Sequence, residues 1–100
     1  MLTDLDSGVL DTIRSGHYRR LFREDSFVTG KLGGTNCNWA KGFYTLSPDI
    51  IPAVLDIIRK EVEACNCFSG FQVAFSQGGG TGSGLGSKIM EQIRESYCDR

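Results

Sequence analysis

The residues best suited to chemistry form one glycine-rich run, Gly78 to Gly84, which reads Gly-Gly-Gly-Thr-Gly-Ser-Gly. An apolar run, residues 71–75, precedes it, and an amphipathic run, residues 85–97, follows it. Glycines lack a Cβ atom, so the backbone can take positive φ and a ligand can come close. The free N–H groups at the start of a helix point at such a ligand, and the helix dipole favours negative charge. The run therefore predicts an anion site, and phosphate is the expected ligand.

Spacing separates this run from the two commonest phosphate loops. A Walker A loop needs Gly, four residues and then Gly-Lys-Ser/Thr, but the only nearby lysine, Lys88, follows Ser87. The dinucleotide fingerprint needs Gly or Ala at its last position, and the three possible registers end at Ser83, Leu85 and Ser87. A flexible Gly/Ser linker is disfavoured, because a strand-like run and a helix-like run bound the turn tightly. The run is a strand-to-helix turn of a third kind, with Thr81 and Ser83 as hydroxyl donors.

The elements that must position this run follow from local patterns. Ser7 is a possible N-cap for a first helix, and Ser47-Pro48-Asp49 opens a second helix with an N-terminal proline and an acidic first turn. That helix begins there or at Pro52, which removes one backbone donor. Residues 71–75 are apolar at four of five positions, which is typical of a strand covered on both faces. The pattern predicts an α/β fold with helices over 7–14, 47–64 and 85–97, strands over 27–29 and 71–75, a loop over 30–38 and an ambiguous segment over 39–46.

The composition is that of one small domain covering residues 1–100. The net charge is −1 and 40% of the residues are hydrophobic, which is ordinary for a globular chain. There is no basic excess for nucleic acid, no run of about 18 apolar residues for a membrane span, and no signal peptide, because Asp4 and Asp6 follow Met1 closely. We therefore expect neither a nucleic-acid nor a membrane partner. Reduced thiols are favoured over a metal site or a disulfide framework for the four cysteines, which are Cys37, Cys65, Cys67 and Cys98.

Several motifs agree in order and spacing with one known family. The run GGGTGSG is the phosphate-loop signature of tubulins, and the chain resembles that family, β-tubulin above all, over nearly its whole length. One apparent single-residue insertion falls between Gly30 and Trp39. The matching segments are Asp4 to Gly8, Arg14-Ser15-Gly16, Asn38-Trp39-Ala40-Lys41-Gly42, Val54-Leu55-Asp56 with Arg59-Lys60-Glu61, Cys65-x-Cys67, Gly70-Phe71-Gln72, and Tyr97 with Asp99-Arg100.

The resemblance implies a partial Rossmann-like GTPase domain of the tubulin type, a parallel sheet with flanking helices that lacks its first strand. In the common strand order 3-2-1-4-5-6, strand 1 lies between strands 2 and 4. Residues 27–29 would be strand 3 and residues 71–75 strand 4. Without strand 1, strand 4 would expose both edges, which is an aggregation hazard.

The resemblance also implies which residues touch the nucleotide. Ser76, Gly80, Thr81 and Gly82 are the expected contacts to phosphate and to the ribose side. The loop Gly33-Gly34-Thr35-Asn36 would face the terminal phosphate, with Asn36 as a donor, and a plain surface turn is the alternative for this loop.

Asp6 is the candidate metal-binding residue. A carboxylate near a triphosphate is repulsive unless a cation intervenes, and Mg²⁺ commonly keeps its waters while taking one or two carboxylates and phosphate oxygens. Asp6 stands where the family normally has a glutamate that contacts nucleotide and Mg²⁺. The alternative is that Asp4 and Asp6 supply only negative charge at a helix N-terminus.

The implied function is that of a β-tubulin-like, GTP-binding constituent of microtubules, in the cytoplasm and cytoskeleton. The implied cofactors are GTP or GDP and Mg²⁺, and the implied partner is an α-tubulin-like subunit in a heterodimer and polymer. No residue of this chain is assigned to catalysis, because hydrolysis needs a positioned water as well as a phosphate cradle. The alternatives are a free-standing nucleotide-binding or phosphate-binding module and a truncated product without activity.

Overall fold

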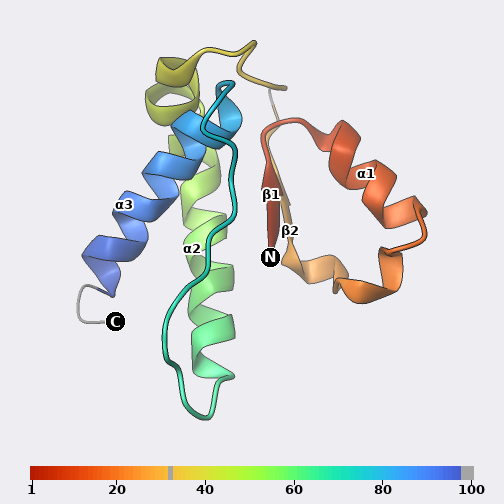
Figure 1. Ribbon diagram of the computed structural model, residues 1–100, viewed down its shortest axis with the longest axis vertical. Coiled ribbons are helices and arrows are strands. Elements are labelled where there is room, and N and C mark those ends of the chain that lie inside the picture. The colour runs from red at the N-terminus through yellow and green to blue at the C-terminus, as the bar shows by residue number, and fades with distance from the viewer. Residues whose placement is uncertain (32, 98–100) are drawn as a thin grey trace.

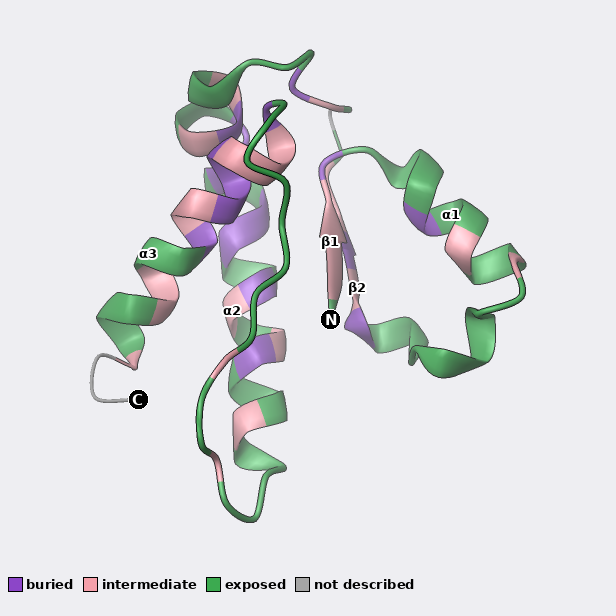
Figure 2. Ribbon diagram, viewed as in Figure 1, coloured by how far each residue is buried: buried purple, intermediate pink, exposed green. Residues whose placement is uncertain are grey.

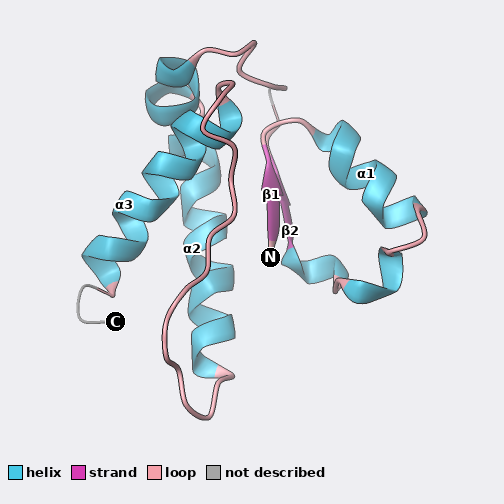
Figure 3. Ribbon diagram, in the orientation of Figure 1, coloured by secondary structure: helices cyan, strands magenta, loops and turns pink. Residues whose placement is uncertain are grey.

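The computed structural model describes residues 1–31 and 33–97 as a mixed α/β arrangement (Figures 1 and 3). The predicted helices at both ends and in the middle of the chain are confirmed, each with slightly different bounds. The regular elements are β1 (Leu2–Asp4), α1 (Ser7–Ser15), β2 (Phe27–Thr29), α2 (Ser47–Glu63) and α3 (Gly86–Ser96). Between them lie two 3-10 turns, η1 (Arg19–Leu21) and η2 (Glu24–Ser26), and two π-helical turns, η3 (Lys41–Thr45) and η4 (Thr81–Leu85).

The described residues contain one parallel sheet of two strands. Leu2 lies opposite Phe27 and Thr3 opposite Val28 in the register of β1 and β2. The strand over 27–29 was predicted, whereas β1 was not among the predicted strands, because three residues show no alternation. Helix α1 contacts the sheet from one side and α2 from the other, with α3 packed on α2 (Figure 1).

Helix α2 supplies more of the core cluster than any other element. Its apolar residues recur at three-residue and four-residue spacing, so Ile50, Val54 and Ile58 share one buried face. The helix begins at Ser47, and Pro52 lies exposed within it, so the alternative start at Pro52 is not what forms. The buried faces of α2, α3 and β2 meet in one cluster (Figure 2). The cluster comprises Leu5, Val28, Leu46, Ile50, Ile51, Val54, Ile58, Leu85 and Ile89.

The expected strand over residues 71–75 is wrong in this structure. The segment is irregular, and Gln72, Val73, Ala74 and Phe75 are exposed rather than covered on both faces. Among the described residues no backbone hydrogen bond joins it to a neighbour. A strand exists only through its ladder partners, and β1 lies across a cleft of about 670 Å³ that β1, the 71–76 segment, α2 and α3 line together. The buried Thr3 Oγ1, also on this cleft, has no hydrogen-bond partner within the described residues.

We expect the amides of residues 71–75 to exchange their hydrogens with solvent far faster than those of Val54 to Ile58. Unpaired, exposed amides exchange from the native state, whereas helical amides under a packed core require opening. Peptide-resolved hydrogen exchange measured by mass spectrometry checks this difference. Equal protection of the two segments would show that residues 71–75 are paired in solution.

The segment over 39–46, ambiguous in sequence, is helical. The π-helical turn η3 runs over Lys41–Thr45, and α2 begins at Ser47 almost without a break. The thiols of Cys37, Cys65 and Cys67 are free and exposed, as expected for reduced cysteines, and Cys98 lies outside the described residues. None of the helices in residues 1–31 and 33–97 combines the length and apolar character needed to cross a bilayer.

Candidate functional site

The glycine run forms a turn that becomes the first turn of a helix. Gly79 has φ +76°, a left-handed conformation that favours glycine. Helical structure begins at Thr81 with η4 and continues as α3, four residues before the predicted start at Leu85. Single π-helical turns of this kind are frequent at functional sites. The second part of the glycine run, from Thr81 to Gly84, therefore lies at the N-terminus of a helix.

This helix N-terminus has no internal cap. Gly80 is the N-cap residue of η4, and no side chain accepts a hydrogen bond there. Within the described part of the chain, no N–H group of residues 78–83 donates a backbone hydrogen bond. The first N–H groups of a helix need an acceptor from a cap, water or a ligand. Several donors with a partial positive charge therefore converge here without an acceptor of the chain's own.

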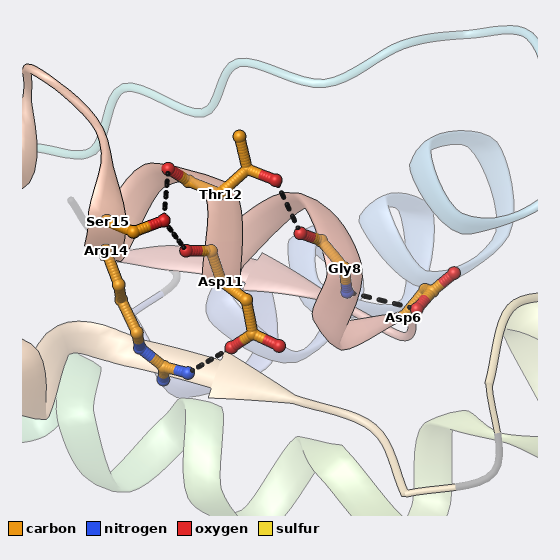
Figure 4. Close-up of polar contacts among 6 residues, drawn as sticks. All are labelled: Asp6, Gly8, Asp11, Thr12, Arg14 and Ser15. Atoms are coloured by element: carbon orange, nitrogen blue, oxygen red, sulfur yellow. Dashed lines mark hydrogen bonds and ion pairs between the residues drawn. The ribbon is translucent and has the colours of Figure 1, made fainter.

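The N-terminus of helix α1, in contrast, is capped by a side chain of the chain itself (Figure 4). Asp6, rather than the predicted Ser7, is its N-cap, and the Gly8 N–H donates to Asp6 Oδ1 at 3.1 Å. Asp6 and Ser7 are both suitable N-cap residues, and the helix begins so that the cap falls one position before the predicted one. Asp6 thus places negative charge at a helix N-terminus, which was the alternative to a metal-binding role. Its second carboxylate oxygen, Oδ2, makes no hydrogen bond within the described residues, and the residue is exposed.

A second loop is held against the glycine run by close packing. Gly80 is buried, and a Cβ atom there would overlap Thr35 Oγ1 and lie 2.7 Å from the Asn38 backbone nitrogen. Thr35 is only 3% exposed. The loop over residues 33–38 therefore cannot separate from the run without opening this contact. The role of Thr35 could not be predicted from the sequence, because nothing in an isolated Gly-Gly-Thr-Asn turn signals burial.

Asn36, the predicted donor of this loop, is exposed and has φ 53°. Cys37 follows with φ 61°, so the backbone makes a left-handed turn at both residues. Asn36 makes no hydrogen bond to another described residue. The structure places it beside the packed Thr35 but shows no contact between its side chain and the glycine run.

Ser76 lies where the irregular segment enters the turn. Its Oγ donates to the Gly78 carbonyl at 3.2 Å, and a Cβ on Gly82 would lie 3.0 Å from the Ser76 backbone nitrogen. The Ser83 hydroxyl donates to the Gly79 carbonyl, so this predicted donor is used within the turn. Thr81, by contrast, is half-buried, and its hydroxyl makes no hydrogen bond within the described residues. The structure therefore brings Ser76, Gly80, Thr81 and Gly82 together.

Asp6 stands apart from this group. The turn between β1 and α1 lies toward the same end of the long axis as the glycine turn (Figure 1), but in the described part of the chain no hydrogen bond or ion pair joins Asp6 to either loop. That part of the chain also contains no cluster of three or more His, Cys, Asp or Glu side chains able to hold a metal by themselves. A cation here would therefore need phosphate oxygens and water in addition to Asp6, which is the coordination that Mg²⁺ commonly takes.

Two basic side chains, Lys88 on α3 and Arg59 on α2, are engaged by neighbouring carboxylates. Lys88 Nζ lies 2.8 Å from Glu91 Oε2 and 4.9 Å from the centroid of the Phe43 ring. The hydrogen bond to Glu91 raises the pKa of Lys88 above its ordinary value. Arg59 is bound on α2 by Asp56 and Glu63. Both side chains are thus already paired, whereas the backbone N–H groups of residues 78–83 and the Thr81 hydroxyl have no partner within the described chain.

Comparison of the sequence with known proteins identifies the family of this chain. The Tubulin/FtsZ family, GTPase domain, matches residues 1–100, so the chain belongs to that family. It is 53% identical over its 100 residues to the tubulin beta-1 chain of Anemia phyllitidis. The chain spans 22% of the length of that relative. Membership of a tubulin GTPase domain implies GTP binding, and the resemblance drawn from the motifs is confirmed.

Proposed function

We propose that this chain binds the phosphates of GTP or GDP at the glycine run, as part of a β-tubulin-like nucleotide site. The uncapped helix start within residues 78–83 carries this proposal, because its N–H groups have no acceptor in the described chain. A phosphate supplies the missing acceptor and the negative charge that the helix dipole favours. The family match makes a guanine nucleotide the expected source of that phosphate.

Each residue of the proposed site has a separate role. Gly80 and Gly82 keep the backbone free of Cβ atoms where it approaches Thr35 and Ser76, so the N–H groups stay aimed in one direction. The Thr81 hydroxyl donates to phosphate, and Ser76, whose hydroxyl holds the turn through Gly78, accepts or donates on the ribose side. In the proposal Asn36 donates to the terminal phosphate from the second loop.

Asp6 fits Mg²⁺ through one carboxylate oxygen. Oδ1 is used as the cap of α1, and Oδ2 is exposed and has no partner within the described residues. One carboxylate oxygen binding a metal-held water is compatible with Mg²⁺. A bound ion would neutralise phosphate charge, and Asp6 would hold one of its waters through Oδ2.

For the longer protein we propose the role of β-tubulin, a GTP-binding constituent of microtubules in the cytoplasm and cytoskeleton. Its partner would be an α-tubulin-like subunit, and the nucleotide would lie at a contact between subunits. The supporting observation is the 53% identity to a tubulin beta-1 chain. We assign binding, and no step of hydrolysis, to this chain, since no acidic group within residues 1–31 and 33–97 forms a hydrogen bond or ion pair at the glycine run.

β1 pairs with β2, the expected strand 3, and so takes the position of strand 2 in the order 3-2-1-4-5-6. The cleft beside β1 then fits strand 1, which that order places between residues 2–4 and 71–75. Backbone groups of the 71–75 segment and the Thr3 hydroxyl lack partners within the described chain, and apolar side chains line the space between them. We propose that a strand of the longer protein occupies this cleft and pairs with both segments. Residues 71–75 would then become the buried strand that their composition predicts.

The phosphate assignment is tested by Thr81→Ala. Losing a hydroxyl that donates to charged phosphate costs about 1.5 to 3 kcal/mol, which is about a tenfold to hundredfold loss of affinity. Titration of the chain with a fluorescent GTP analogue in the presence of Mg²⁺ measures this. Thr45→Ala is the matched control, because Thr45 is exposed on η3 and makes no side-chain hydrogen bond in the described chain. Equal affinities of the two variants would refute the assignment.

The metal assignment is tested by Asp6→Asn. Asparagine caps a helix as well as aspartate does, so helix content stays unchanged while the negative charge is lost. We expect the gain in GTP affinity on adding Mg²⁺ to shrink by about tenfold, since the charged group that holds a metal-bound water is removed. Asp11→Asn removes an equal charge from the exposed side of α1 and serves as the control. An unchanged Mg²⁺ dependence in Asp6→Asn would restrict Asp6 to capping.

A further inference from the structure

A basic segment lies at the far end of α1, away from the glycine run. Residues 14–23 contain Arg14, Arg19, Arg20 and Arg23, together with His17, and no acidic residue. The whole chain has a net charge of −1, so this segment is a local reversal of charge. Figure 1 shows η1 at the outer end of the loop that connects α1 with β2, on the side of the sheet opposite α2 and α3.

The two outer arginines of this segment are used within the fold. Arg14 Nη1 lies 3.0 Å from Asp11 Oδ1 (Figure 4), and the Arg14 guanidinium stacks 4.8 Å from the centroid of the Phe27 ring. Arg23 pairs with Asp25 at 3.6 Å and with Glu61 on α2. These contacts fix both ends of the loop to α1, β2 and α2.

The two inner arginines have no such partners. In the part of the chain that the structure describes, neither Arg19 nor Arg20 forms an ion pair or a side-chain hydrogen bond, and both are exposed. With Ser15, Gly16 and His17 they line a depression of about 410 Å³. A loop fixed at both ends thus presents two adjacent guanidinium groups around a hollow, and guanidinium groups bind carboxylates through paired hydrogen bonds.

Apolar side chains flank this basic hollow. Tyr18 is 67% exposed and Leu21 is 71% exposed, so one aromatic and one aliphatic group stand beside the arginines. Nucleic acid would need a broad basic surface to neutralise several phosphates, whereas this patch offers two free guanidinium groups on a chain that is acidic elsewhere. Two adjacent guanidinium groups with an apolar side chain on each side match a peptide that carries both carboxylates and an apolar residue.

We propose that η1 and its flanking residues 15–21 form a docking site for a short acidic peptide segment of a partner protein. The partner's carboxylates pair with Arg19 and Arg20, and its apolar side chain packs on Tyr18 and Leu21. The site is separate from the glycine run, so peptide and GTP bind independently. This inference does not depend on the proposed nucleotide function.

The test is fluorescence anisotropy of the full chain with a labelled Glu-Glu-Phe-Glu-Glu peptide. Arg19→Gln with Arg20→Gln is expected to raise the Kd of the peptide by about tenfold or more. The matched control, Lys31→Gln with Arg94→Gln, removes the same charge from other exposed positions and should change the Kd by less than about twofold. Far-UV circular dichroism confirms equal helix content in both double variants.

Two further arms separate the peptide from other polyanions. Tyr18→Ser should weaken binding of the phenylalanine peptide about threefold and leave binding of a Glu-Glu-Ala-Glu-Glu peptide unchanged. An oligothymidylate of equal charge should bind more weakly than the phenylalanine peptide. The proposal is overturned if the wild-type chain does not bind the peptide, if both double variants lose affinity equally, or if the oligothymidylate binds as tightly.

Discussion

Gly80→Ala is expected to lower the affinity of the chain for GTP by at least about tenfold, equivalent to about 1.4 kcal/mol. The new Cβ would overlap Thr35 Oγ1 and press on the Asn38 backbone nitrogen. Thr35 is buried and Asn38 N is backbone, so neither can yield without moving the loop over 33–38. Overpacking of this kind costs about 1 to 3 kcal/mol of stability. Isothermal titration calorimetry with GTP and urea unfolding measure the two effects.

Gly8→Ala is the matched control for this substitution. A Cβ at Gly8 would meet only Asp6 Oδ1 at 3.6 Å, an ordinary contact. Because alanine favours helix over glycine by about 1 kcal/mol, this variant should be as stable as the original chain or more so, with GTP affinity unchanged. If Gly80→Ala behaved like Gly8→Ala, the two loops would not be held together as described.

Leu85→Ala is expected to unfold a large share of the chain. Leu85 ends η4, is 2% exposed and belongs to the core cluster with α2, so it ties the glycine run to the core. Truncating a buried leucine costs about 2 to 5 kcal/mol, against a total stability of only about 5 to 15 kcal/mol for ordinary domains. The urea midpoint of the far-UV circular dichroism signal should fall accordingly.

Met90→Ala provides the comparison on the same helix. Met90 is 43% exposed on α3, and truncation at such a position should change stability by less than about 1 kcal/mol. Similar urea midpoints for the Leu85 and Met90 variants would mean that the glycine run is not anchored through Leu85.

The helices could be predicted because their signals are local. The spacing of Ile50, Val54 and Ile58 fixes which face of α2 is buried, whatever it packs against. The cap of α1 was misplaced by one position, since Asp6 and Ser7 are both good cap residues and only the backbone turn decides between them. The π-helical turns η3 and η4 have no sequence pattern of their own, so the early helix start at Thr81 could not be foreseen.

The strand over 71–75 shows the opposite case. Its apolar composition describes a buried environment, but strand structure requires a neighbour on at least one edge. No backbone partner for it lies among the described residues, and the segment is irregular, with residues 72–75 exposed. Apolar composition alone was therefore not sufficient to predict the structure of this segment.

The hydrogen-bond donors of the candidate site could be predicted from the sequence, but the packing of Thr35 against the glycine run could not. The glycines and Thr81 follow from the run itself, because their types and order already specify a helix start for an anion. The burial of Thr35 depends on which glycine of a distant segment approaches it. Such long-range packing leaves no trace in the local sequence.

The central claim is that the N–H groups of residues 78–83 receive the phosphates of GTP. The most direct measurement is the change in amide chemical shifts of the ¹⁵N-labelled chain on adding GTP with Mg²⁺, compared with adding guanosine alone. The account predicts that the largest shifts fall on Gly79 to Ser83 and require the phosphates. Shifts of equal size with guanosine, or largest shifts outside the glycine run and the loop over 33–38, would contradict it.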